Sequence, residues 1–374
     1  MSSKKNEGGA VVPGERARKG SPSKLCLYAL LVLAVTMCSS AGTVFLLMSE
    51  VPPFLRASWR LYAQTIVQIV PFVCEYRKLA NKQGDDTIAK WRQHFLWMLL
   101  SGFFLGLHFA SWVWSLEHTS LAHSLLWVTM YPIVLNSGHW VCFLVSQYLY
   151  LKWKEFFEKP TWLETAGSIV GIGGAIVMLA DVTVASSPNE KSPTIVGDMA
   201  AFMGAVTMCV YLLVGRWMRK WCPIWLYMTP VAFFAALTCT VASALFEGMS
   251  WGGLGATSWF GFLSPLYILF AFYLGGGAGV GGHTLLNYLL TFLSTLVVST
   301  SLLLEPLVGS LLGACFGLQS LPGLYTILGT PVLFAGLGMI IAGEQRRVTA
   351  RKVTEQEAMS VAKKNDVEIE IEIS

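Results

Sequence analysis

Long stretches without charge dominate this sequence. The first of them, Leu25–Met48, runs for 24 residues without an Asp, Glu, Lys or Arg. A helix needs about 20 apolar residues to cross the hydrocarbon core of a bilayer, where no water satisfies free backbone groups. Only 13% of the 374 residues are charged, about half the share in ordinary soluble domains. An apolar share of 54% excludes a disordered chain. The sequence therefore predicts an all-α integral membrane protein.

Ten segments of this kind fit between two polar tails. The predicted spans are 25–48, 54–74, 94–116, 121–149, 162–181, 195–215, 224–246, 263–289, 294–317 and 323–343. They divide the chain into an N-terminal tail 1–23, a first five-helix repeat 24–182, an extracytoplasmic linker 183–194, a second five-helix repeat 195–343 and a C-terminal tail 344–374. The prediction is a multi-pass protein with ten transmembrane helices.

Positive charges test this division independently. If the N-terminal tail is cytoplasmic, all but Arg56, Arg60 and Lys191 of the 26 Lys and Arg residues fall in cytoplasmic segments. Membrane proteins retain Lys and Arg on the cytoplasmic side. We therefore predict cytoplasmic N- and C-termini and an even number of spans. The plasma membrane is the default location, and an organelle membrane is the alternative.

Two blocks of the chain, Gly102–Pro132 and Gly277–Pro306, are similar in pattern. His108 matches His283 and Trp112 matches Asn287 at an offset of 175, and the two prolines match at 174. Repeats of five helices, an odd number, enter the membrane from opposite sides. The sequence thus predicts an inverted-topology repeat, which is typical of secondary transporters with a substrate site near the midplane.

Several segments resemble the drug/metabolite transporter (DMT) superfamily, and its EamA-type members in particular. These segments are Pro53–Arg60, Gly197–Ala201, Gly282–Tyr288, Leu304–Pro306 and Leu328–Gly338. The resemblance covers about 25–345 and implies a ten-helix EamA-like fold that moves a small metabolite or drug-like solute. In the first half, Tyr131 stands at the position that matches Glu305.

Polar and aromatic residues within the predicted spans are the candidates for a substrate cavity. They recur at helical spacing and comprise His108 with Trp112, His283 with Asn287, and His123 with Trp127 and Tyr131. Residues one turn apart share a helix face, and aromatic faces suit flat or cationic organic molecules. The alternative interpretation is hydrogen bonding between helices and packing of the Trp side chains, which any bundle contains.

Two charges lie well inside predicted spans, Arg60 and Glu305. An ionisable residue there costs about 2.5–3.5 kcal/mol on insertion scales, so it should face a cavity or a partner. Glu305 is a candidate for proton coupling, or it satisfies backbone groups freed by Pro306. Arg60 either contacts the substrate, or its long side chain snorkels to the interface or bonds to carbonyl groups.

The predicted function is secondary active transport of a small organic metabolite or drug-like solute by alternating access. An exchanger of phosphorylated sugars or nucleotide sugars is the alternative within the superfamily, although such cargo requires more Lys or Arg in the cavity. A channel and an intramembrane enzyme are the alternatives from other classes. We expect no catalytic residue, cofactor, metal or nucleic-acid partner. The expected partners are the substrate, the bilayer, a coupling proton and a second copy in a homodimer.

Overall fold

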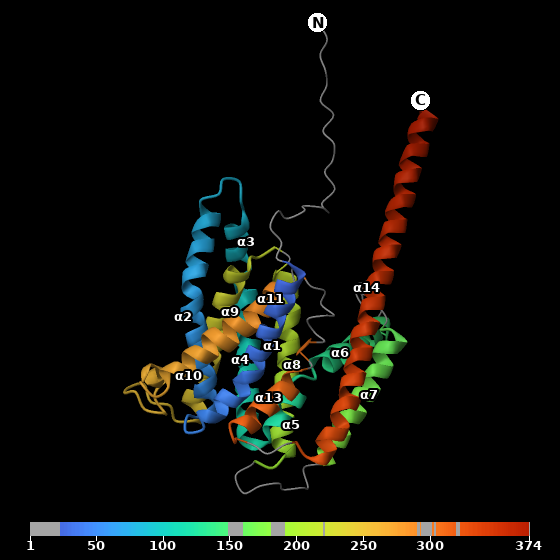
Figure 1. Ribbon diagram of the computed structural model, residues 1–374. Coiled ribbons are helices and arrows are strands. Elements are labelled where there is room, and N and C mark those ends of the chain that lie inside the picture. The colour runs from blue at the N-terminus through green and yellow to red at the C-terminus, as the bar shows by residue number, and fades with distance from the viewer. Residues whose placement is uncertain are drawn as a thin grey trace.

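The structure is a computed structural model (Figure 1) that describes residues 23–148, 160–180, 191–219, 221–289, 292, 301–302, 304–318 and 322–373. Every regular element in these ranges is a helix, and one isolated bridge joins Ser250 and Ser258. Most of the predicted tail 1–23 and of the linker 183–194 lies outside the described residues. So does the first part of the predicted span 294–317.

The helices of the first half begin immediately after the N-terminal tail. They are α1 (Lys24–Leu47), α2 (Pro53–Ala80), α3 (Thr87–Gln93), α4 (Phe95–His118), α5 (Leu121–Val128), α6 (Tyr131–Tyr148) and α7 (Trp162–Leu179). The predicted span 121–149 is therefore broken into α5 and α6. The break falls at Thr129–Met130, just before the Tyr131-Pro132 pair, because proline is tolerated in the first turn of a helix but not in its interior.

The second half has more interruptions. Its helices are α8 (Ile195–Met218), α9 (Ile224–Phe246), the 3-10 turn η3 (Trp259–Leu263), α10 (Ile268–Phe272), the π-helix η4 (Tyr273–Thr284), α11 (Leu285–Leu289), α13 (Glu305–Cys315) and α14 (Leu324–Ile373). The predicted span 263–289 begins later, at Ile268, because Ser264 ends the η3 turn. Here α13 also begins directly before a proline, Pro306.

Seven helical segments among the described residues are long and apolar enough to cross a membrane. They are Lys24–Leu47, Phe95–His118, Leu121–Val145, Ile195–Gly215, Ile224–Phe246, Ile268–Leu289 and Leu324–Ala350. A shorter apolar helix covers Trp162–Met178. The prediction of an all-α, multi-pass membrane protein is confirmed, and each of the seven segments overlaps a predicted span.

The helix α2 is long but unusually polar for a span. Arg56, Arg60, Gln64 and Gln68 recur every four residues along it, and all four are buried. A spacing of four residues places them along one face of the helix. That face points into the bundle, because α2 packs against α4, α9 and η4.

Pairs of helices from the two halves make up the body of the molecule. The α4 helix packs on α8 and α9, whereas η4 packs on α1 and α2. The α13 helix packs on α1 and α5, and α14 lies along α7 (Figure 1). Glycine allows the closest of these approaches, since a Cβ on Gly167 of α7 would lie 2.6 Å from the carbonyl oxygen of Gly336 in α14.

The α2 and α9 helices form a pair in which each caps the other. The Glu247 carboxylate, which follows α9, accepts the N–H groups of Phe54 (2.7 Å) and Leu55 (3.0 Å) at the start of α2. The Glu75 carboxylate, near the end of α2, accepts the N–H of Trp225 at 3.1 Å at the start of α9. It also accepts the N–H of Leu226. Neither helix has a side-chain cap of its own, because a proline occupies each N-cap position.

The start of α1 and the end of α14 lie at the same end of the bundle (Figure 1). The connection between α2 and α3 lies there too. The segment 344–373, which belongs to the predicted C-terminal tail, continues α14 as helix. It projects past the bundle beside the upper end of α7 (Figure 1).

Candidate functional site

Arg60 is buried inside the bundle without a hydrogen-bond acceptor among the described residues. Its side chain has no exposed surface, and none of its three guanidinium nitrogens has a partner among the described residues. The guanidinium carbon instead lies 4.2 Å from the Phe109 ring centroid, with Phe45 at 5.8 Å and Trp112 at 6.0 Å. These cation–π contacts stabilise the charge, but they leave its five N–H donors without an acceptor in the part of the chain that the structure describes. Arg60 does not snorkel to the surface.

Glu305 brings the opposite charge toward the same place. It lies at the first residue of α13 and is within electrostatic range of Arg60 and hydrogen-bonded to the Cys38 thiol of α1. Tyr131, its counterpart in the first half, is within electrostatic range of both Glu305 and Cys38. The two positions that the predicted repeat relates therefore lie near one another, one carrying a carboxylate and the other a phenol.

The predicted histidine pair flanks this charge. Phe109 contacts both rings, that of His108 at 4.9 Å and that of His283 at 6.0 Å between centroids. His108 Nδ1 lies 2.8 Å from the carbonyl oxygen of Gly204 in α8, which makes this nitrogen the protonated one in a neutral ring. The Trp112 ring stacks on His108 at 6.3 Å, and its indole Nε1 is buried without a partner among the described residues.

His123 belongs to a different group of contacts. Its Nδ1 lies 3.0 Å from Asp198 Oδ2, and its Nε2 lies 3.1 Å from the Thr326 hydroxyl. Thr119 donates to Asp198 Oδ1 at 2.7 Å. Both nitrogens of the His123 ring are thus engaged, and they tie α5 to α8 and α14.

Two further predicted cavity residues also have local partners. Asn287 accepts from Arg219, at 2.8 Å through its side-chain oxygen and at 3.0 Å through its backbone oxygen. Trp127 packs edge-on against Phe202 at 6.0 Å. Of the nine residues that the sequence singles out, the structure gathers Arg60, His108, Trp112, Tyr131, His283 and Glu305. It places His123, Trp127 and Asn287 in separate contacts.

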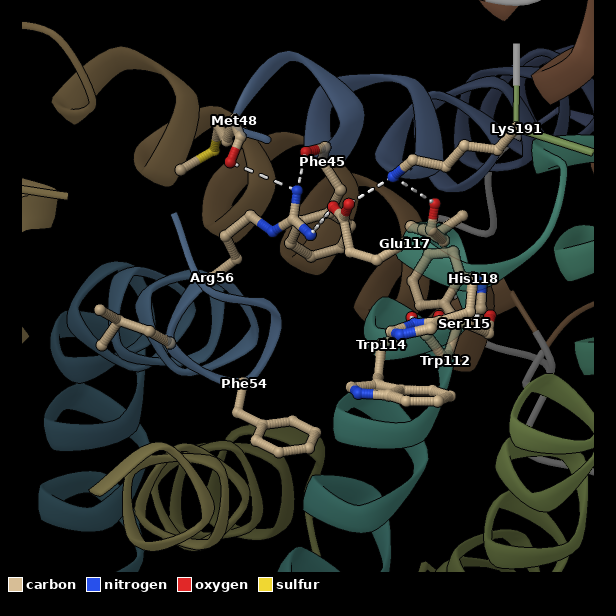
Figure 2. A network of polar contacts seen from close by, with 12 residues as sticks. Phe45, Met48, Phe54, Arg56, Trp112, Trp114, Ser115, Glu117, His118 and Lys191 are labelled. Atoms are coloured by element: carbon tan, nitrogen blue, oxygen red, sulfur yellow. Dashed lines mark hydrogen bonds and ion pairs between the residues drawn. The ribbon is translucent and has the colours of Figure 1, made fainter. Parts of the chain in front are cut away.

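A network of ion pairs lies where the end of α1 meets the start of α2 (Figure 2). Arg56 donates to the carbonyl oxygens of Phe45 (2.6 Å) and Met48 (3.3 Å), and to the Glu117 carboxylate at the end of α4. The other carboxylate oxygen of Glu117 pairs with Lys191. One carboxylate therefore joins α2, α4 and the segment that leads into α8.

Sequence reasoning missed several residues of the site. Phe109 and Phe45 supply the faces around Arg60, and Cys38 bonds to Glu305. The four-residue spacing of the polar positions on α2 is a signal in the sequence that could have marked its inward face. Phe109 gave no comparable signal, because an aromatic residue in an apolar helix is common in any bundle.

A hydrolase-like motif in the chain does not form a nucleophile site. Gly248–Gly252 matches the G-x-S-x-G pattern, which in hydrolases lies between a strand and a helix. Here it follows the helix α9, and the Ser250 hydroxyl lies 3.3 Å from the carbonyl oxygen of Gly252 and 3.4 Å from that of Thr257. Among the described residues, no group of three or more His, Cys, Asp or Glu side chains could hold a metal ion.

Comparisons with known proteins do not identify a family. No protein-family model matches the chain, and no curated protein matches it. Solved structures that are similar include one described as "Crystal structure of protein", which aligns with 88% of this chain and 99% of its own length. The TM-score is 0.46 and the sequence identity 17%. A likeness of this degree supports no argument about function, so the interpretation of the site rests on its own geometry.

Proposed function

We propose that this protein is a secondary active transporter for a small organic solute, built as a ten-helix, DMT-like inverted repeat. The observation that carries the proposal is the group formed by the buried residues Arg60 and His108 and the partly buried residues Glu305 and His283. Helices from both halves contribute to it. Ionisable residues at depth in a membrane protein face a partner or a pathway. A site between two inverted repeats is where secondary transporters bind their cargo.

The packing of the helices supports the inverted repeat. If α1, α2, α4, α5–α6 and α7 correspond to α8, α9, α10–α11, α13 and α14, the contacts fall into matched pairs. The packing of α4 on α8 and α9 matches that of η4 on α1 and α2, and α5 on α8 matches α13 on α1. Three further pairs, α2–α9, α5–α13 and α7–α14, each join equivalent helices. The caps of α2 and α9 follow the same relation, since Glu75 and Glu247 are 172 positions apart.

The distribution of charge supports a cytoplasmic location for both termini. The end of the bundle where α1 begins and α14 leaves it also carries the connection between α2 and α3 (Figure 1). That connection and its flanks hold Arg77, Lys78, Lys82, Lys90 and Arg92. Positive residues favour the cytoplasmic side. The plasma membrane is the location we propose.

Contacts at both ends of the central group suggest how access alternates. The Arg56–Glu117–Lys191 network closes one end, and the bonds from Arg219 to Asn287 join α8 to α11 nearer the other. In the proposed cycle these two closures open in turn. Glu305 carries the coupling proton, since it is the acidic group within range of Arg60 among the described residues.

Uptake into proteoliposomes from a panel of small metabolites tests the proposal. A transporter gives saturable uptake of some member of the panel, driven by a pH gradient. Glu305→Gln should abolish the pH-driven component and leave exchange of cargo measurable, because a side chain that holds no exchangeable proton still permits binding. Unchanged pH dependence in this variant would exclude Glu305 as the coupling group. Conductance without saturation would instead indicate a channel.

A further inference from the structure

The two arginines of α2 are equally buried but differ in their hydrogen bonds. Arg56 and Arg60 lie one turn apart, and neither has exposed surface. Both terminal groups of Arg56 are occupied by carbonyl oxygens and by Glu117, whereas Arg60 has no acceptor among the described residues. Leaving a buried donor unsatisfied costs about 1–3 kcal/mol, and more for a charged group. A ligand that accepts from these donors would offset the cost.

The surroundings of Arg60 are rich in donors and poor in acceptors. The indole N–H of Trp112, whose ring centroid lies 6.0 Å from the guanidinium carbon, is also buried and unpartnered within the described chain. The Phe45 and Phe109 rings present apolar faces. This combination fits an anion attached to an apolar or aromatic body. A neutral amine would add donors where none is lacking.

The charged and titratable groups around Arg60 come from five helices. Glu305 of α13, Cys38 of α1, His108 of α4 and His283 of η4 all interact with it electrostatically. Tyr131 of α6 faces Glu305 and Cys38. The α5 helix also packs on α13, but its histidine is bonded to Asp198 and Thr326. Among the described residues, Glu305 is therefore the negative charge available to balance Arg60, and it does so without a direct hydrogen bond.

We propose that Arg60 binds a carboxylate group of the cargo, and that this carboxylate and the ionised Glu305 compete for the same guanidinium. The inference rests on the proposed transport function and adds the chemical class of the cargo. A guanidinium presents paired N–H groups that match a carboxylate in bidentate geometry. Among the described residues, Arg60 is the buried arginine whose guanidinium has no hydrogen-bond acceptor. One guanidinium balances one negative charge, so a small organic monocarboxylate is the cargo.

The competition between the cargo carboxylate and Glu305 for the Arg60 guanidinium couples cargo binding to the uptake of a proton. When Glu305 takes up a proton on a carboxylate oxygen, Arg60 loses its balancing charge and gains affinity for the anion. When the anion leaves, Glu305 releases the proton and balances Arg60 again. One proton and one monoanion then move together, and no net charge crosses the membrane.

Ligand binding to the purified full-length protein tests this inference. Tryptophan fluorescence is titrated with acetate and benzoate, with neutral benzamide, and with inorganic phosphate, at acidic and at neutral pH. We expect a carboxylate to bind, more tightly at acidic pH, and benzamide to bind at least about tenfold more weakly, the effect of one charge-assisted hydrogen bond. Benzamide that binds as well as benzoate would overturn the inference, as would a preference for phosphate.

Variants assign the binding to Arg60. Arg60→Gln should weaken carboxylate binding by about tenfold or more, and Arg60→Lys, which keeps the charge but loses the fork of donors, by less. Arg92→Gln removes the same charge from an exposed position on α3 and should leave binding unchanged. Glu305→Gln should bind tightly at both pH values. Equal binding by the wild type and Arg60→Lys and Arg60→Gln variants would overturn the inference.

The outcomes separate this inference from the transport proposal. Transport of neutral solutes by a protein that binds none of the carboxylates would overturn the assignment to Arg60 and leave the transporter standing. Carboxylate binding that depends on Arg60, in a protein that transports no member of a panel rich in carboxylates, would overturn the transport proposal alone.

Discussion

At the scale of single residues, a polar side chain in this bundle is defined by its partner. Arg56 and Arg60 are indistinguishable by residue type and burial, yet one is a structural cation and the other is without an acceptor among the described residues. The sequence predicted that Arg60 and Glu305 matter. It could not predict which arginine is occupied, because the acceptors of Arg56 come from α1 and α4.

The Glu117 carboxylate provides the sharpest test at this scale. Glu117→Gln leaves the fully buried Arg56 without its counter-charge, whereas Lys191→Gln removes a partner whose side chain is 41% exposed. We expect the first variant to lose about 3 kcal/mol of unfolding free energy or more. The second should lose less than about 1 kcal/mol, because solvent screens the exposed pair.

Unfolding in mixed micelles by increasing SDS measures both variants. Unfolding free energies that fall equally would mean that the network is a surface ion pair and does not stabilise this end of the bundle.

At the scale of helices, the lengths of the apolar helices could be predicted from the sequence, and the contacts between the helices could not. The bilayer thickness fixes how long a span must be, so seven predicted spans overlap the helices that meet that length. Breaks were harder to place. The interruption at Thr129–Met130 and the π-helix over Tyr273–Thr284 depend on local backbone bonding. His123 was grouped with Trp127 and Tyr131 by its spacing, but its bonds are with Asp198 and Thr326, which belong to other helices.

The reciprocal caps of α2 and α9 give the prediction at this scale. Glu75→Ala and Glu247→Ala each free the N–H groups at the start of the other helix, and each should lower the unfolding free energy by about 0.5–2 kcal/mol. The two effects should add, because the sites lie at opposite ends of the helix pair.

The control for these variants is Asp86→Ala. Asp86 is the N-cap residue of α3 but makes no side-chain capping bond, so its removal should change the unfolding free energy by no more than about 0.5 kcal/mol. A loss in only one of the two glutamate variants would argue against the equivalence of the two helix ends.

At the scale of the whole molecule, the proposed transport function depends on the proposed inverted-repeat relation between the two halves of the chain. The matching of His108 with His283 was legible in the sequence, because both sit in similar apolar blocks. The matching of Glu75 with Glu247 was not, because a capping glutamate looks like any charge at the end of a span until its partner helix is known.

Topology is the prediction that belongs to this scale. Epitope tags placed at the N- and C-termini should both be inaccessible to antibody in intact cells and both become accessible after permeabilisation. In the proposed architecture each repeat contains an odd number of spans, so two repeats return the chain to the side where it began. Detection of only one tag from outside would refute the inverted repeat. Tags placed in the α9–α10 connection should show the opposite accessibility.

The paired caps restrict how such a molecule can change shape. Hydrogen bonds join α2 and α9 at both ends of the pair. Sliding one helix along the other would therefore break the bonds between at least one carboxylate and two backbone N–H groups. A rotation of the two helices together about their common axis would leave both sets of capping bonds intact. The α2–α9 pair would then be the rigid axis of a conformational change, and the α7–α14 pair, which does not share these caps, would rotate relative to it.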